Sequence, residues 1–143
     1  MTGARDMAGH LIRRLHQQSA QVFQQRMQAA GLDLTPVQFA ALDAVSAEPG
    51  MDQATLAARI AYDRATIGGV VDRLAAKGLL HRAVSRADRR ARVLALTEAG
   101  AALLAAARPR VLALQADILG PLDPAEGAAL LALVRKALGG DAP

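Results

Sequence analysis

The fold of this chain is decided by residues 63–97, DRATIGGVVDRLAAKGLLHRAVSRADRRARVLALT. Apolar side chains recur in the first half of this stretch at the i, i+3, i+4 and i+7 spacing of an amphipathic helix, namely Ile67, Val70, Val71 and Leu74. Asp63 is suited to cap the start of this helix, and Gly78 is suited to end it in the left-handed conformation. The pattern therefore predicts a helix over residues 64–77.

The second half of the stretch predicts two strands joined by a basic tip. Residues 80–84 and 93–97 each alternate with a period of two, which is typical of a β-ribbon. The connecting residues 85–92 carry four arginines against a single acid. A short helix over residues 53–60 and a turn at residues 61–63 precede the first helix. A helix-turn-helix followed by a basic ribbon is a winged helix, and this combination favours binding to nucleic acid.

Two adjacent glycines interrupt the helix over residues 64–77. Each costs a helix about 1 kcal/mol relative to alanine, so some feature of the protein should require them. Close approach to another backbone or to a groove is the natural reason for Gly68 and Gly69.

Four segments in chain order resemble the MarR family of bacterial transcription regulators: LTPVQFAAL at 34–42, QATLAARI at 53–60, DRATIGGVVDRLAAKGLL at 63–80 and DRRARVLALTEAG at 88–100. The most specific piece is the Asp-x-Arg wing followed by L-x-LT-x-x-G, here from Asp88 and Arg90 to Gly100. The resemblance covers about residues 8–138. It implies a winged helix-turn-helix that binds DNA as a homodimer.

The charge distribution agrees with a duplex-binding surface. The chain of 143 residues has a net charge of +4, but residues 59–92 alone hold nine basic and three acidic side chains, which leaves the remainder at −2. Such a basic segment on a nearly neutral body is the footprint of nucleic-acid binding. The absence of cysteine excludes disulfides and thiolate metal sites, and neither a signal peptide nor a membrane span is apparent, so a cytoplasmic protein is expected.

The flanking segments predict further helices, so the fold class is mainly α with one small ribbon. A long helix is expected over residues 6–30, another from Pro36 to about residue 48, and a fifth over about 99–119 that Pro109 should kink or divide. A last helix should run from Pro124 to about residue 138. Residues 1–34 and 98–143 are expected to form a helical dimerisation region because their apolar faces exceed what one copy can cover, and residues 35–97 to form the DNA-binding lobe.

Candidate DNA contacts fall into two groups on the helix-turn-helix. Arg64, Thr66, Gly68 and Gly69 are expected to face base edges in the major groove. Gln53, Thr55 and Arg73 are the candidates for phosphate contacts, which position a protein without recognising sequence. An ordinary solvated helix face is the alternative, but the glycines, the preceding helix and the ribbon all favour a DNA-binding face.

The wing supplies the remaining candidates. Arg90 stands where the family resemblance implies a wing-tip arginine that enters the minor groove. Asp88 is expected to orient Arg90 or Arg86 through an ion pair. Arg86, Arg89 and Arg92 are candidates for phosphate contacts.

The three histidines do not predict a metal site, because no His, Asp or Glu cluster has the spacing of ligands. His10 and Arg14 share one helix face with Arg13 beside them, which suits either a dimer-interface role or an anion pocket between the first helix and the DNA-binding lobe. The family resemblance implies that such a pocket takes a small aromatic acid.

The sequence therefore predicts a homodimeric regulator, most simply a repressor, that binds a pseudo-palindromic operator on double-stranded DNA and is released by a small effector. An enzyme is disfavoured because the sequence has no nucleophile–base set, no phosphate loop and no clustered carboxylates, and no cofactor is expected. A winged-helix module that binds proteins and not DNA is the remaining alternative, and salt-dependent DNA binding separates the two.

Overall fold

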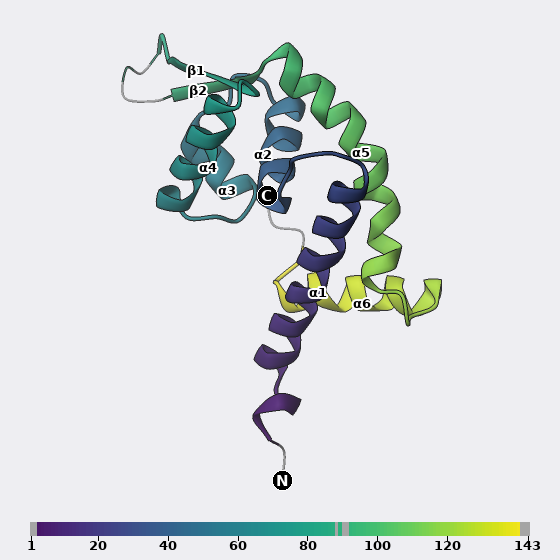
Figure 1. Cartoon of the computed structure of the whole chain (residues 1–143). Coiled ribbons are helices and arrows are strands. Elements are labelled where there is room, and N and C mark those ends of the chain that lie inside the picture. The colour runs from purple at the N-terminus through teal and green to yellow at the C-terminus, as the bar shows by residue number, and fades with distance from the viewer. Residues whose placement is uncertain (1–2, 88, 90–91, 141–143) are drawn as a thin grey trace.

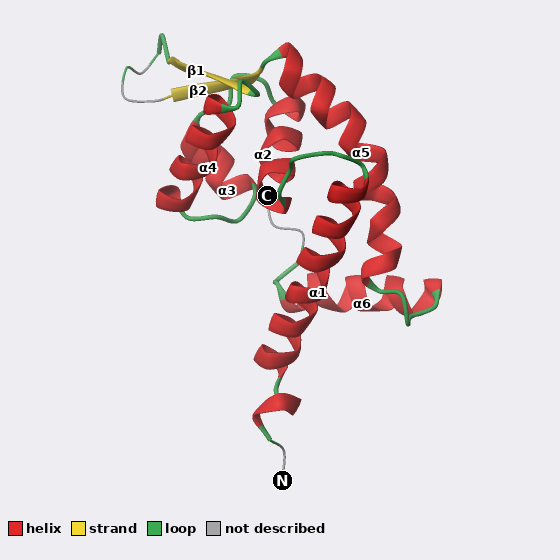
Figure 2. Ribbon diagram, viewed as in Figure 1, coloured by secondary structure: helices red, strands yellow, loops and turns green. Residues whose placement is uncertain are grey.

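The computed structural model describes residues 3–87, 89 and 92–140, and it is helical apart from one small sheet (Figures 1 and 2). In chain order the elements are a 3-10 turn Ala4–Asp6, α1 Ala8–Ala29, α2 Pro36–Ala47, α3 Gln53–Arg59, α4 Arg64–Ala76, β1 Leu80–Val84, β2 Arg92–Leu96, α5 Glu98–Ile118 and α6 Pro124–Ala137. The expected fold class, a mainly helical chain with a winged helix-turn-helix, is confirmed.

Local sequence signals set most of these boundaries. Thr35 caps α2 and Gln38 closes a capping box with it, while Asp123 caps α6 in the same manner. Proline occupies the first position of both helices. The start of α1 differs from the prediction, because Met7 is extended and separates the 3-10 turn from a helix that begins at Ala8.

The wing is an antiparallel pair in which Leu80 lies opposite Leu96 and Val84 opposite Arg92. The loop before α3 pairs with β2 at one isolated bridge, without forming a third strand. The N–H of Gly50 donates to Leu94 O at 2.8 Å, and the N–H of Leu94 donates to Met51 O at 2.9 Å. The wing is therefore joined by backbone hydrogen bonds to the residues that lead into the helix-turn-helix.

One hydrophobic core holds the helix-turn-helix, the wing and α5 together. Its fully buried members come from α1, α2, α3, α4, β2 and α5, and include Leu42, Leu56, Leu74, Leu94 and Leu114. The second half of α1 joins this core through Phe23 and Met27. The lobe and α5 thus share a continuous apolar interior, which fixes how α3, α4 and the wing are oriented relative to α5.

The helix α5 passes through Pro109 as one element and is not divided there. Figure 1 shows that it bends between its upper half, beside the lobe, and its lower half, beside α1. A mid-helix proline removes one backbone hydrogen bond and clashes with the preceding turn, which explains a bend. The kink alternative of the sequence prediction is therefore the one observed.

Both ends of the chain leave apolar side chains uncovered. No residue of α6 is buried, and Leu133 and Leu138 are 62% and 76% exposed. On the first half of α1, Leu11 and Ile12 are 50% and 67% exposed. Figure 1 shows that this half of α1 projects beyond the rest of the chain.

Candidate nucleic-acid interface

The interface is built on α3 and α4, whose starts are fixed by aspartate caps. The N–H of Thr55 donates to Asp52 at 2.7 Å, and the N–H of Thr66 donates to Asp63 at 2.7 Å. Hydrogen bonds from the side chain and backbone of Thr55 lower the pKa of Asp52, and those from the backbone and side chain of Thr66 lower the pKa of Asp63. Both caps are therefore ionised at neutral pH.

The turn between the two helices has a backbone conformation that alanine seldom adopts. Ala61 has a φ of 59°, while its N–H donates to Ala58 O and the N–H of Tyr62 donates to Ala57 O. These two bonds are the Schellman closure of a helix, which ordinarily places glycine at this position. Elsewhere in the chain Gly31 and Gly78 occupy the same place, with φ of 69° and 74°.

The basic side chains around the interface fall into two groups. Three are paired with acids: Arg59 with Glu48 at 3.2 Å, Lys77 with Asp33 at 3.0 Å, and Arg82 with Asp72. Five exposed arginines have no ion pair with any acid that the structure describes: Arg64, Arg73, Arg86, Arg89 and Arg92. Exposed pairs add little stability, so the consequence of the pairing is electrostatic, and it concentrates the unneutralised charge on α4 and the wing.

The predicted base-facing residues lie on the outer side of α4. Arg64 and Thr66 are exposed, and the hydroxyl of Thr66 donates to Asp63 at 3.0 Å. Gly68 and Gly69 have no close backbone contact: a Cβ on Gly68 would lie 3.6 Å from Nε2 of Gln53, and a Cβ on Gly69 would meet nothing within 4 Å. Packing inside this chain therefore does not require either glycine. Close approach to another molecule is the remaining reason for having glycine at these two positions.

The wing carries its described arginines at the solvent-facing tip. Arg86, Arg89 and Arg92 are exposed, and the guanidinium of Arg92 donates to Arg89 O at 3.4 Å. Asp88 and Arg90, the predicted ion pair and wing-tip contact, lie outside the described residues. Figure 1 shows the wing extending past α4 on the side of the lobe away from α1 and α6.

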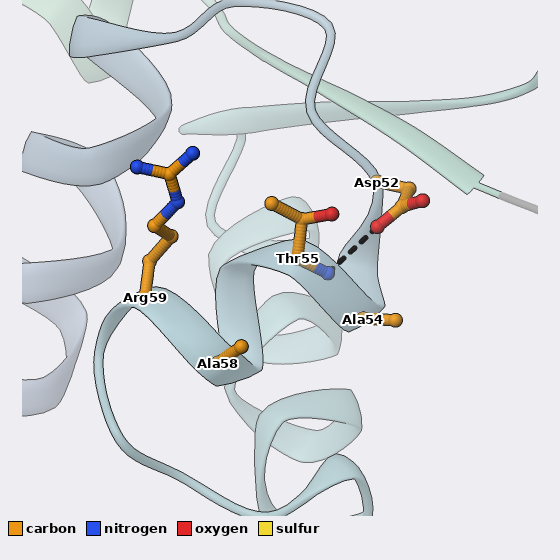
Figure 3. Close-up of a pocket in the computed structure, with 5 residues that line it drawn as sticks. All are labelled: Asp52, Ala54, Thr55, Ala58 and Arg59. Carbon is orange, nitrogen blue, oxygen red and sulfur yellow. Dashed lines mark hydrogen bonds between the residues drawn. The ribbon is translucent and has the colours of Figure 1, made fainter. Parts of the chain in front are cut away.

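An open cavity of about 440 Å³ lies on the outer face of α3 and is lined by Asp52, Ala54, Thr55, Ala58 and Arg59 (Figure 3). Figure 3 shows Asp52 and Thr55 at one end of α3 and Arg59 at the other, extending away from them. Of the two polar candidates on α3, Thr55 is half-buried and its N–H is used by the cap. A second, smaller cavity of about 80 Å³ lies where α3 meets α4, lined by Gln53, Ala54, Arg64 and Ile67.

The predicted anion cluster lies apart from this surface. His10, Arg13 and Arg14 are on the projecting first half of α1, where His10 is half-buried and the two arginines are exposed. None of the three lines either cavity on the lobe. Over the part of the chain that the structure describes, no group of three His, Asp or Glu residues could hold a metal ion, and no helix combines the length and apolar character of a membrane span.

The sequence prediction missed that Asp52 connects the start of α3 to the wing. Asp52 caps α3 and at the same time forms an isolated bridge with Val93 of the wing. The only sequence signal for this contact is the turn Pro49-Gly50 before an extended pair of residues, which does not specify a partner strand.

Comparison with known proteins gives a consistent family. A model of the MarR family matches residues 32–91. The HTH-type transcriptional repressor NicR of Pseudomonas putida is 38% identical over 136 residues, which covers 95% of this chain and 85% of that protein.

Solved structures match the whole fold. BpsR of Bordetella bronchiseptica, whose DNA binding is regulated by 6-hydroxynicotinic acid, is similar with a TM-score of 0.89 and 33% identity over 99% of both chains. The transcriptional repressor CouR, solved bound to a 23-mer DNA duplex, has a TM-score of 0.83 and 28% identity over 96% of this chain and 98% of its own.

Proposed function

This chain belongs to the MarR family, and from that premise we propose that it is a repressor that binds a pseudo-palindromic operator as a homodimer and releases it when a small aromatic acid binds. The observation that carries DNA binding is the separation of the basic side chains. Arg59, Lys77 and Arg82 are neutralised by acids, whereas the arginines of α4 and the described arginines of the wing have no ion pair with a described acid. Among the described residues of the lobe, the free positive charge therefore lies on the two elements that a winged helix presents to DNA.

Within this interface, Arg64, Thr66, Gly68 and Gly69 face base edges in the major groove. Thr55, Arg73, Arg86, Arg89 and Arg92 contact phosphates, and Arg90 enters the minor groove with Asp88 orienting it. The glycines support this assignment because no contact inside the chain explains them. A helix without side chains at these positions approaches the floor of the groove more closely.

The dimer is assembled from both ends of the chain. Apolar side chains of α6 and of the first half of α1 are exposed in the single copy, and a second copy related by a two-fold axis would cover them. Residues 1–34 and 98–143 form this dimerisation region, and residues 35–97 form the DNA-binding lobe. A two-fold arrangement also presents two copies of α4, the recognition helix of the helix-turn-helix, to half-sites about 34 Å apart.

The effector binds at the cluster of His10, Arg13 and Arg14. A guanidinium is suited to a carboxylate, and BpsR is regulated by the aromatic acid 6-hydroxynicotinic acid. Because these residues lie on the projecting half of α1, the second wall of the pocket comes from the partner copy. Binding there would shift the dimer toward an arrangement in which the two recognition helices no longer match the operator.

As a DNA-binding regulator, the protein is proposed to act in the cytoplasm, without a catalytic role. The function is tested by mapping the promoter DNA that the purified protein protects and by titrating that duplex at several salt concentrations. We expect the logarithm of the affinity to fall linearly with the logarithm of the salt concentration. An absence of protection at low salt would instead favour a winged-helix module that binds proteins.

A further inference from the structure

The amide of Gln53 lies on the recognition helix, although Gln53 belongs to α3. Nε2 of Gln53 is 3.6 Å from the position that a Cβ of Gly68 would occupy. Such a distance is an ordinary van der Waals contact, so the amide lies over the position on α4 where a side chain at residue 68 would begin. The first residue of one helix is thus placed at the outer face of the next.

This amide has no hydrogen-bond partner among the described residues. Gln53 is half-buried, and neither its carbonyl oxygen nor its NH₂ group is paired within residues 3–87, 89 and 92–140. Other glutamines are used by the fold: the buried Gln38 completes the capping box of α2, and the exposed Gln18 donates to Ile118 O. A half-buried amide with unused donor and acceptor capacity at the DNA-facing surface is suited to an external partner.

Arg64 borders the same small cavity as Gln53. Both side chains line the 80 Å³ cavity between α3 and α4, together with the apolar groups of Ala54 and Ile67. After the hydrogen bonds of Thr55, the positive charge of Arg64 also contributes to the lowered pKa of Asp52, the residue before Gln53 in the chain.

We propose that Gln53 recognises one A·T base pair in each half-site, with its amide bonded to N6 and N7 of the adenine and the cavity beside it receiving the methyl group of the thymine. Glutamine pairs with adenine in two hydrogen bonds in the major groove, and small apolar groups such as that of Ala54 contact the thymine methyl. The proposal rests on the proposed DNA binding and changes the role of Gln53 from a phosphate contact to a specificity residue.

The glycine at position 68 is what permits this contact. A longer side chain there would occupy the space between the amide and the groove, and would keep the base edge away from α4. Glycine leaves the backbone bare, so the base pair comes within reach of a side chain that starts on α3. Arg64 is then positioned to recognise a guanine next to the same adenine.

The test uses a duplex selected by the parent protein from a pool of random 20-mers. Every base pair of one half-site is changed in turn, and the parent protein and Gln53→Met are titrated against each duplex. Methionine keeps the length of the side chain and removes the amide. We expect one A·T position at which any change weakens the parent about tenfold or more, while Gln53→Met discriminates there weakly or not at all and keeps its preferences elsewhere.

Atom-level substitutions in the DNA sharpen this comparison. Replacing the adenine with 7-deazaadenine removes N7, and it should weaken the parent but not Gln53→Met. Replacing the paired thymine with uracil removes the methyl group and should weaken both proteins. Gln25→Met, a change at an exposed glutamine of α1, serves as the control and should reproduce the parent profile.

Two results would overturn the proposal. An equal loss of affinity by Gln53→Met on every duplex would make Gln53 a phosphate contact, and an unchanged profile would exclude Gln53 from the interface. A parent protein that selects no duplex from the pool would contradict the proposed function itself, so the two failures are distinguishable.

Discussion

A Cβ placed on Gly100 would lie 2.0 Å from the carbonyl oxygen of Leu79, which is closer than any side chain allows. The start of α5 therefore rests directly on the residue that leads into the wing. Thr97 completes this contact, because its hydroxyl donates to Gly78 O at 2.6 Å and accepts the N–H of Gly100 at 2.9 Å. The recognition helix, the wing and α5 are joined at this point.

Gly100→Ala should destabilise the protein by about 4 kcal/mol or prevent folding, because backbone atoms must move to admit one methyl group. Chemical denaturation followed by circular dichroism measures the change. Gly69→Ala is the matched control, since a Cβ there meets nothing within 4 Å. That variant should be more stable by up to about 1 kcal/mol and bind operator more weakly. Equal stability of both variants would contradict the close contact at Gly100.

Ala61→Gly should stabilise the protein by about 0.5 kcal/mol. The left-handed conformation costs alanine about 1–2 kcal/mol, and glycine removes this cost. Glycine also has greater freedom in the unfolded chain, which cancels part of the stabilisation. Thermal denaturation of the variant against the parent gives the difference. The reverse change, Gly78→Ala, imposes the same penalty on alanine at a φ of 74° and should destabilise the protein. A loss of stability in Ala61→Gly would argue against the Schellman closure of the helix-turn-helix.

The two aspartate caps should make stability fall in acid. Hydrogen bonds lower the pKa values of Asp52 and Asp63 in the folded protein below the ordinary value of 3.8. A carboxyl with a depressed folded pKa contributes stability above its unfolded pKa, and this contribution is lost as the pH falls through the folded value. The contribution of these two caps to the free energy of unfolding should therefore be constant from neutrality to about pH 5 and should decrease below about pH 4.

The double variant Asp52→Asn and Asp63→Asn is the control for this pH dependence. Asparagine also caps helices but does not titrate, so the acid decline should be smaller than in the parent. A parent and double variant with the same dependence on pH would assign the acid sensitivity to other carboxyls.

Arg90→Ala should weaken operator binding by about 1–3 kcal/mol, the scale of a specific contact. Fluorescence anisotropy with the protected duplex measures this loss, and Arg110→Ala, an exposed arginine of α5, controls for the loss of one positive charge. If Arg90→Ala binds operator as tightly as the parent and Arg89→Ala loses much of its affinity, then Arg89 and not Arg90 makes the wing-tip contact.

Arg14→Met should separate effector response from DNA binding. The variant keeps the apolar stem and loses the guanidinium, so it should bind operator normally and require at least about tenfold more 6-hydroxynicotinate, used as the probe, for half release. Loss of operator affinity as well would indicate a structural role at the dimer interface. An unchanged response in the presence of a working parent would remove the His10, Arg13 and Arg14 cluster from the effector site.

The sequence by itself determined the elements of the lobe and most of their ends. The apolar period of residues 67–74 gave the recognition helix, and the alternation on either side of the arginine tip gave the wing. Capping is a local interaction between residues three apart, so Asp52, Asp63, Thr97 and Asp123 could be recognised without knowledge of the fold. The arginine candidates of α4 and the wing followed from composition in the same local way.

Only the tertiary structure decided which basic side chains remain free and why particular glycines are needed. Arg82 is separated from Asp72 by ten positions and Lys77 from Asp33 by forty-four, and nothing in either segment specifies the partner. In the sequence, Gly100 and Gly68 both read only as glycines within helices. In the structure, Gly100 lies against the backbone of Leu79, and Gly68 lies beneath the amide of Gln53. These differences arise from contacts between distant segments, which depend on how the shared core orients the helices and not on the preferences of any single stretch.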